Sequence, residues 1–219
     1  MSEGFRYQGA ELDLFANAQN WKRYWAAQIR PWLTGDVLEV GAGIGTNAVL
    51  LQNSAVKSWH CIEPDPELRL RLAEAVSILP NCQATGGTIE SVAVGKLFDS
   101  ILYIDVLEHI ESDREELARS VRLLRPGGHL IVLSPAHQSL FSAFDVAVGH
   151  FRRYDRKSLL ACSPAGVRLE ALFYLDSVGV CASLANRVML RQGSPMKGQI
   201  LTWDKFFVPV SRILDRVGL

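Results

Sequence analysis

The spacing of apolar residues changes repeatedly along the chain, and these changes predict its secondary structure. Short runs of consecutive apolar residues indicate strands buried on both faces, whereas apolar residues three or four positions apart indicate helices. Such runs recur through the first 134 residues with helical patterns between most of them. The predicted strands are 36–40, 58–62, 82–85, 98–104 and 129–134.

Helices are predicted before the first strand and between the strands. Apolar residues at helical spacing, from Leu14 through Trp21 and Trp25 to Ile29, predict one helix over 11–30. Strands that alternate with helices predict an α/β fold, a doubly wound, mostly parallel sheet with helices on both faces. The other predicted helices begin near 45 or cover 66–78 and 112–125, the last ended by Pro126-Gly127-Gly128.

The pattern changes after residue 135. Segment 135–157 has few regular signals, and a short helix, a strand near 167–175 and two helical stretches follow. The last stretch, WDKFFVPVSRILDRVGL, is predicted to be a helix broken near Pro209, with no strand after it. The sheet edge left open could be covered by a homodimer partner. The apolar face of this stretch could also touch a lipid, but its net positive charge is too small to favour that interpretation.

Composition excludes several classes of protein. The net charge is zero and the pI is neutral, so we expect no nucleic-acid partner. The polar start is unlike a signal peptide and no apolar run is long enough to span a bilayer, which predicts a cytoplasmic protein without a membrane span. The four cysteines form no CxxC pair, so we expect reduced thiols and assign no metal.

The segment VLEVGAGIGTNA, residues 37–48, carries three alternating glycines after a predicted strand. A dinucleotide-binding loop would have its third glycine one position later than Gly45. Glu39 would repel a pyrophosphate, but it suits a ligand that carries an ammonium and a sulfonium. Glu63 ends the next strand, 22 residues after Gly41, where a carboxylate can accept two hydrogen bonds from a ribose diol.

Four segments in order, VLEVGAGIGT, CIEPD, FDSILYIDVLEHI and LLRPGGHLIVLSP, resemble the motifs of class I S-adenosylmethionine-dependent methyltransferases over about residues 36–135. The later FSAFDVAVGHFRRYDRKSL resembles a bacterial small-molecule branch of that family. The resemblance implies S-adenosylmethionine as the cofactor. It also implies cofactor contacts from Glu39, Gly41, Ala42, Gly43, Glu63, Pro64, Gly87, Thr88 and, beside the transferable methyl, Asp105. Many members have an acid near the adenine, where this chain has Gly-Gly-Thr.

With this resemblance, we expect one domain across residues 1–219. Residues 1–34 would form an N-terminal helical cap and 35–135 the cofactor-binding half. Residues 136–219 would form the substrate side and the C-terminal helices.

Methyl transfer needs alignment of the reactants and only sometimes a base. Asp105, Glu108 and His109 could face one pocket, and ubiquinone-pathway O-methyltransferases show a similar acid-x-x-Glu-His pattern that binds a divalent cation in some members. We favour the alternative that Glu108 and His109 hold the cofactor pocket shut, because one carboxylate pair and a histidine are few ligands for a hard cation.

The segment GHFRRYD, 149–155, is the second candidate. Arg152 and Arg153 could bind a substrate carboxylate or phosphate, and His150 or Tyr154 could act as base or hydrogen-bond donor. His137 and Asp105 are further candidates for taking a proton. Alternatively, the segment is an ordered lid held by salt bridges to acids such as Asp145.

Aromatic residues form the third candidate group. Trp21 and Tyr24 could place aromatic faces against the sulfonium, although packing is the favoured role for both. Trp25 is expected to pack, and Tyr174 could face the pocket.

The favoured function is methyl transfer to oxygen or nitrogen of a small, acidic metabolite. One alternative is a cyclase that converts S-adenosylmethionine to azetidine-2-carboxylate and methylthioadenosine. The other is a non-catalytic regulatory module that binds the cofactor.

Overall fold

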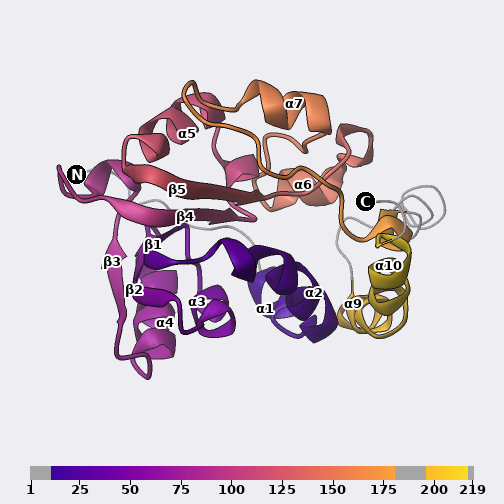
Figure 1. Ribbon diagram of the computed structural model, residues 1–219. Helices are drawn as coiled ribbons and strands as arrows, with labels where there is room; N and C mark the ends of the chain where they lie inside the picture. Colours follow the sequence, from indigo (N-terminus) through magenta and orange to yellow (C-terminus); the bar gives the residue numbers. More distant parts are fainter. Residues whose placement is uncertain (1–10, 181–195, 217–219) are drawn as a thin grey trace. The chain divides into compact units, whose positions relative to one another are not determined.

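The computed structural model describes residues 11–180 and 196–216 (Figure 1). Contacts within the chain divide it into two compact units. In the described residues, the first comprises Ile29–Ser134 and Cys162–Val167, and the second comprises 11–28, Pro135–Ala161, 168–180 and 196–216. The prediction of a single domain with three parts stays a prediction.

The first unit contains a five-stranded parallel sheet in the order β3-β2-β1-β4-β5. The chain moves outward from β1 in one direction and then returns to continue on its other side, so the order reverses between β1 and β4. Helices α3 (Thr46–Leu51) and α4 (Pro66–Val76) lie on one side of the sheet and α5 (Asp113–Val121) on the other (Figure 1). The predicted doubly wound α/β fold is confirmed. The strands are β1 Gly35–Val40, β2 Val56–Glu63, β3 Cys82–Gly86, β4 Phe98–Ile104 and β5 Leu124–Leu133.

Helix α4 of this unit starts at a sequence signal that satisfies its first amide groups. Asp65 Oδ1 accepts the N–H groups of Glu67 and Leu68 and so caps α4, which runs from Pro66 to Val76. On the other face, the Tyr103 hydroxyl of β4 donates to Glu116 Oε1 of α5 (2.9 Å). The remaining elements are α3 Thr46–Leu51, α5 Asp113–Val121 and the short 3-10 helices Arg30–Trp32, Ile89–Ser91 and Leu107–His109.

The boundary between α5 and β5 was predicted wrongly. Helix α5 ends at Val121 rather than Arg125, and β5 begins at Leu124, before Pro126-Gly127-Gly128. Phe98 pairs with Leu124 and Ser100 with His129, so the intervening residues bulge out of the ladder. A bulge tolerates proline and glycine inside a strand, and Gly127 has a φ of 80°.

The second unit consists of helices and irregular segments. The predicted helix over 11–30 is two helices, α1 Glu11–Phe15 and α2 Gln19–Ile29. The predicted strand near 167–175 is wrong, since no strand is assigned to this segment. Its other elements are the 3-10 helix Gln138–Leu140, α6 Ala143–Ala147, α7 Arg156–Ala161, α9 Lys197–Thr202, the π-helix Trp203–Phe207 and α10 Val208–Leu214.

The C-terminal helices continue through the predicted break. Pro209 lies in the first turn of α10, and the π-helix joins α10 to α9. No described helix has the length and apolar character needed to cross a bilayer. Cys61, Cys82 and Cys162 are free thiols, as expected, and Cys181 lies outside the described residues.

Candidate functional site

The glycine loop follows β1 at the carboxyl end of the sheet, next to the point where the strand order reverses. Gly41, Gly43 and Gly45 all have positive φ, at 64°, 56° and 80°. A Cβ on Gly41 would lie 2.8 Å from Val106 Cγ2, so the turn after β4 closes against this loop. Ligands of doubly wound sheets bind at this reversal point, which agrees with a cofactor loop.

Gly45 serves packing as well as the turn. A Cβ there would lie 2.9 Å from Leu72 Cδ1 and 3.2 Å from the Ala75 Cβ of α4. The glycine thus allows α3 to start close against α4. The early third glycine of the motif is explained by this helix contact.

Glu39 is buried inside β1, at 1% exposure. Trp59 Nε1 donates to its Oε2 (2.9 Å), and the Cys61 thiol lies 3.8 Å from the same atom. By hydrogen-bond geometry, Oε1 has no partner among the described residues. The side-chain amide of Asn47 is nevertheless near enough to Glu39 to lower the pKa of that carboxyl group. Burial dominates, and it raises the pKa of Glu39 to about 7.

Glu63 ends β2 and holds the glycine loop from the neighbouring strand. The Gly43 N–H donates to its Oε2 (2.8 Å), and the Asp65 N–H donates to its Oε1 (2.9 Å). Burial raises the pKa of Glu63 despite these hydrogen bonds. The carboxylate therefore sits beside the loop, and each oxygen has a lone pair left for a hydroxyl.

Glu39 and Glu63 are two buried carboxylates next to the glycine loop. Neither forms an ion pair with any residue that the structure describes, and the charge of Glu63 itself raises the pKa of Glu39. A positively charged ligand would offset both the burial of the Glu39 carboxylate and its repulsion by Glu63. The open Oε1 atom and the glycine cradle thus fit an ammonium-bearing cofactor and disfavour a pyrophosphate.

The predicted adenine position follows β3. Gly87 has a φ of 121°, and its N–H donates to the Glu63 carbonyl (3.2 Å). The exposed Thr88 hydroxyl donates to Glu90 Oε2 (2.6 Å). The sequence has no acid at the expected position, but Glu90 lies two residues after Thr88 and its carboxylate contacts the Thr88 hydroxyl.

Asp105 follows β4 directly and has a φ of 54°, which is uncommon outside glycine. Its N–H donates to the Leu133 carbonyl of β5 (2.8 Å), which holds the backbone in this conformation. The side chain is exposed at the carboxyl end of the sheet. Strained backbone of this kind is found disproportionately at functional sites, so the predicted role of Asp105 is compatible with its position.

In the second unit, the segment 142–153 is organised around one buried acid, Asp145. Arg153 contacts both of its oxygens, Nε to Oδ1 at 2.7 Å and Nη2 to Oδ2 at 3.0 Å. His150 Nδ1 lies 2.9 Å from Oδ1, and the N–H and hydroxyl of Ser142 donate to Oδ2. Burial alone would raise the pKa of Asp145, but the hydrogen bonds from His150 and Arg153 hold it well below its usual range.

This arrangement separates the candidates of the GHFRRYD segment. The guanidinium of Arg153 is committed to Asp145, which favours the lid interpretation for that residue. Arg152 lies over the Phe151 ring instead, 5.8 Å from its centroid. Tyr154 is buried, and its backbone pairs with Pro135 and His137. Asp155 caps α7 by accepting the Ser158 N–H (2.7 Å).

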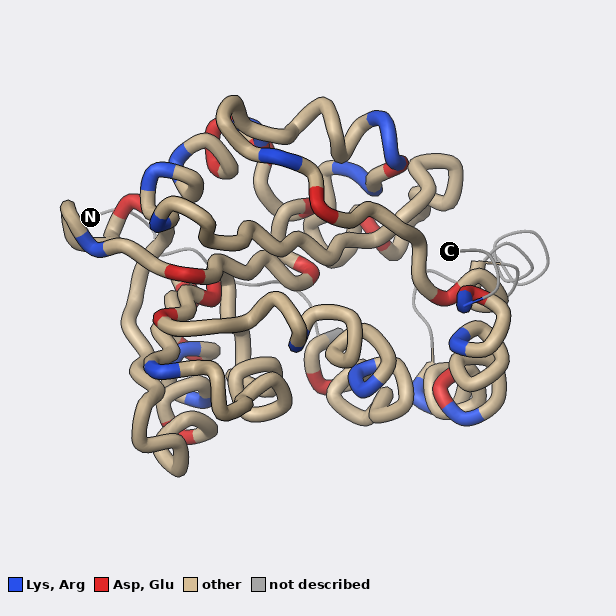
Figure 2. Tube along the Cα trace, in the orientation of Figure 1, with Lys and Arg blue, Asp and Glu red and all other residues tan. Residues whose placement is uncertain are grey.

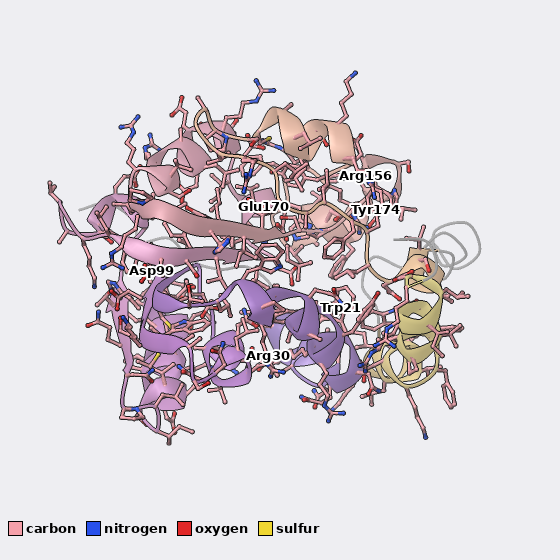
Figure 3. The ribbon with its side chains drawn as sticks, viewed as in Figure 1. Trp21, Arg30, Asp99, Arg156, Glu170 and Tyr174 are labelled. Carbon is pink, nitrogen blue, oxygen red and sulfur yellow. The ribbon has the colours of Figure 1, made fainter. Side chains whose placement is uncertain are left out.

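Two further candidates lie together. The rings of His137 and Tyr174 stack with centroids 4.7 Å apart and planes at 20°. The Arg156 N–H donates to the Tyr174 hydroxyl (3.0 Å), and its guanidinium lies 5.5 Å from the centre of that ring. Both residues are labelled in Figure 3. His137 has a φ of 65°, so its backbone is strained at the point where the ring stacks.

The aromatic residues of α2 pack mainly within the second unit. Trp25 and Tyr24 are buried, as packing requires, and the Tyr24 hydroxyl donates to Asp215 Oδ2 (2.8 Å). Trp21, labelled in Figure 3, is half-buried between Tyr24 and Trp203. Its contact with a cofactor stays a prediction.

Comparison with known proteins defines the class. A family model described as a methyltransferase domain matches residues 14–163. The chain therefore belongs to this methyltransferase family. A search of curated proteins found no matching sequence.

Solved structures share the fold at low identity. YcgJ from Bacillus subtilis is 18% identical over 64% of this chain and 65% of its own, with a TM-score of 0.56. The N-methyltransferase NodS from Bradyrhizobium japonicum is 20% identical over 68% of this chain and 82% of its own (TM-score 0.53). The [4+2]-cyclase SpnF is 17% identical over 64% of this chain and 55% of its own (TM-score 0.54). The aligned part thus spans less than two thirds of YcgJ, and a cyclase shares the fold.

Proposed function

We propose that this protein transfers a methyl group from S-adenosylmethionine to oxygen or nitrogen of a small, acidic metabolite. The observation that carries the proposal is the pair of buried carboxylates, Glu39 and Glu63, beside a three-glycine loop and without an ion-pair partner among the described residues. These two carboxylates favour a cofactor that carries positive charge.

Glu39 Oε1 would accept a hydrogen bond from the ammonium of the cofactor, and Glu63 would accept from its ribose. Gly41 and Gly43 would allow close backbone approach, and Gly87 with Thr88 would border the adenine. When bound, the cofactor supplies an activated methyl on a sulfonium, so the protein has to align the acceptor and remove its proton.

His150 is our choice for the residue that takes the proton. The Asp145 carboxylate is acceptor-only, so His150 Nδ1 must be the donor in their 2.9 Å contact. In the neutral imidazole this leaves Nε2 as the basic nitrogen, in the manner of an acid that orients a catalytic histidine. Arg152 would hold the acidic group of the acceptor, while Arg153 stays with Asp145.

The test is an acceptor screen by mass spectrometry with methyl-labelled cofactor and a set of small carboxylates and amines. We expect label transfer to a carboxylate-bearing acceptor. His150→Gln should lower kcat and should leave cofactor affinity unchanged. Transfer only to uncharged acceptors would contradict the acidic substrate, and an unchanged kcat would remove His150 from the reaction.

A further inference from the structure

The outward surface of the C-terminal helices, residues 196–216, combines exposed apolar and basic side chains. We call this surface the C-terminal face. Ile213 is 66% exposed and Phe206 58%, although both are large apolar residues. The other exposed apolar members are Met196, Leu201, Phe207, Val210 and Leu214, and the exposed basic members are Lys197, Lys205, Arg212 and Arg216.

The opposite side of the same helices is buried. Its residues recur three or four positions apart across α9, the π-helix and α10, so they form one continuous stripe. The stripe consists of Ile200, Asp204, Val208, Ser211 and Asp215. Both acidic residues of the segment 196–219 are in this stripe.

Each of these acids is held inward by backbone donors. Asp204 accepts the N–H groups of Asn20 and Trp21 at the start of α2, at 3.1 and 2.8 Å. Asp215 accepts the Asp176 N–H and the Tyr24 hydroxyl, both at 2.8 Å. The acids therefore cap helices and bind polar groups inside the unit, and the C-terminal face presents only cations.

From sequence alone, the net positive charge of the C-terminal stretch is too small to favour contact with a lipid, and the inward position of its acids changes that interpretation. The segment holds four basic and two acidic residues, which understates the positive charge that solvent meets. Figure 2 shows the basic positions along α9 and α10. Lys205 Nζ lies 5.4 Å from the Phe206 ring centre, so a cation and a large apolar ring occupy one place on the face.

We propose that the C-terminal face docks this protein on a bilayer surface that contains anionic phospholipid. Exposed phenylalanine, isoleucine and leucine beside lysine and arginine suit the boundary between headgroups and acyl chains. The anionic surface adds attraction for each cation. A second copy of this face would bring like charges together, which disfavours a homodimer through it.

The test measures sedimentation of the whole chain with vesicles, without cofactor, so that its result is independent of methyl transfer. Vesicles of phosphatidylglycerol with phosphatidylcholine are compared with phosphatidylcholine alone. We expect binding to the anionic vesicles that falls with added salt. Lys205→Ala with Arg212→Ala should weaken it about 25-fold, because each cation contributes about fivefold.

The apolar contribution is tested with Phe206→Ser and Ile213→Ser, which should also reduce binding to anionic vesicles. Ile78→Ser, a 74% exposed position in the first unit, and Lys57→Ala are the matched controls and should bind like wild type. Circular dichroism checks that each variant is folded.

Absence of binding to anionic vesicles would overturn the proposal. Equal loss in the controls would overturn it too, since the effect would not belong to this face. A wild-type dimer that Phe206→Ser dissociates, with no vesicle binding, would assign the face to a second copy instead.

Discussion

Replacing Glu39 by glutamine should stabilise the cofactor-free protein and weaken cofactor binding. The carboxylate is buried, and burial raises its pKa from an ordinary 4.5 to about 7. Glutamine keeps the shape and an oxygen that can accept from Trp59 Nε1, but it has no charge to desolvate. The same residue is thus expected to cost stability and to provide affinity.

The magnitude follows from the pKa. Because the folded-state pKa is above the unfolded one, the penalty is absent below about pH 4.5, grows as pH rises and is complete above about pH 7. The shift from 4.5 to about 7 corresponds to about 3 kcal/mol of unfolding free energy at pH 8. Glu39→Gln should recover most of that at pH 8 and almost nothing at pH 4.5.

Binding should change in the opposite direction. Loss of a hydrogen bond between charged groups should cost about 1.5–3 kcal/mol, or roughly 10- to 100-fold in the Kd for S-adenosylmethionine. In wild type, affinity should fall about fivefold or more from pH 7.5 to pH 6, because Glu39 must lose a proton to accept the ammonium. The variant should lack this pH dependence.

Urea unfolding at pH 4.5 and 8 measures the stability, and calorimetric titration at pH 6 and 7.5 measures the affinity. Glu74→Gln, an exposed acid on α4, is the control and should match wild type in both. A Glu39→Gln protein that is less stable at pH 8, or that binds the cofactor as wild type does, would refute this reasoning.

Three other changes probe the fold and the site. Glu63→Ala should weaken S-adenosylmethionine binding by about 3–6 kcal/mol in the same calorimetric assay, the value of two hydrogen bonds to a charged acceptor; unchanged affinity would remove the ribose role. Gly45→Ala should lower the free energy of unfolding more than Gly95→Ala, since both glycines have positive φ but only Gly45 has neighbours within 4 Å; equal urea midpoints would show that crowding by α4 is unimportant. Asp145→Asn should lower the free energy of unfolding by about 3–5 kcal/mol, because it breaks the buried pair with Arg153. Since the pKa of Asp145 is lowered in the folded state, its stabilising contribution is full above about pH 4 and is lost as pH falls further. The acid unfolding curves of wild type and variant should therefore converge.

The central strands β1, β2 and β4 could be predicted from sequence because they are largely buried and read as apolar runs. The predicted range 98–104 is β4 as observed. Errors arose where a distant residue decides the local structure. Asp204 caps the start of α2 from 184 positions away, which no local pattern around 16–18 could reveal.

In the candidate site, too, some features could be predicted from sequence and others depend on contacts that the sequence does not reveal. Glu39, Glu63 and the glycines belong to strand ends, so their meeting at one edge of the sheet follows from topology. The role of Asp145 was underestimated, because its partnership with both Arg153 and His150 depends on the turn between α6 and Tyr154. A short Asp-x4-His-x2-Arg spacing was one available signal.

The central claim is methyl transfer, and one measurement tests it most directly. The pure protein is incubated with methyl-labelled S-adenosylmethionine, with and without a mixture of small carboxylates, and the products are followed by mass spectrometry. We expect intact cofactor without acceptor, and S-adenosylhomocysteine with an equal amount of labelled product when acceptors are present. Methylthioadenosine formed without any acceptor would contradict the account and identify a cyclase, and failure to bind the cofactor at all would contradict the site itself.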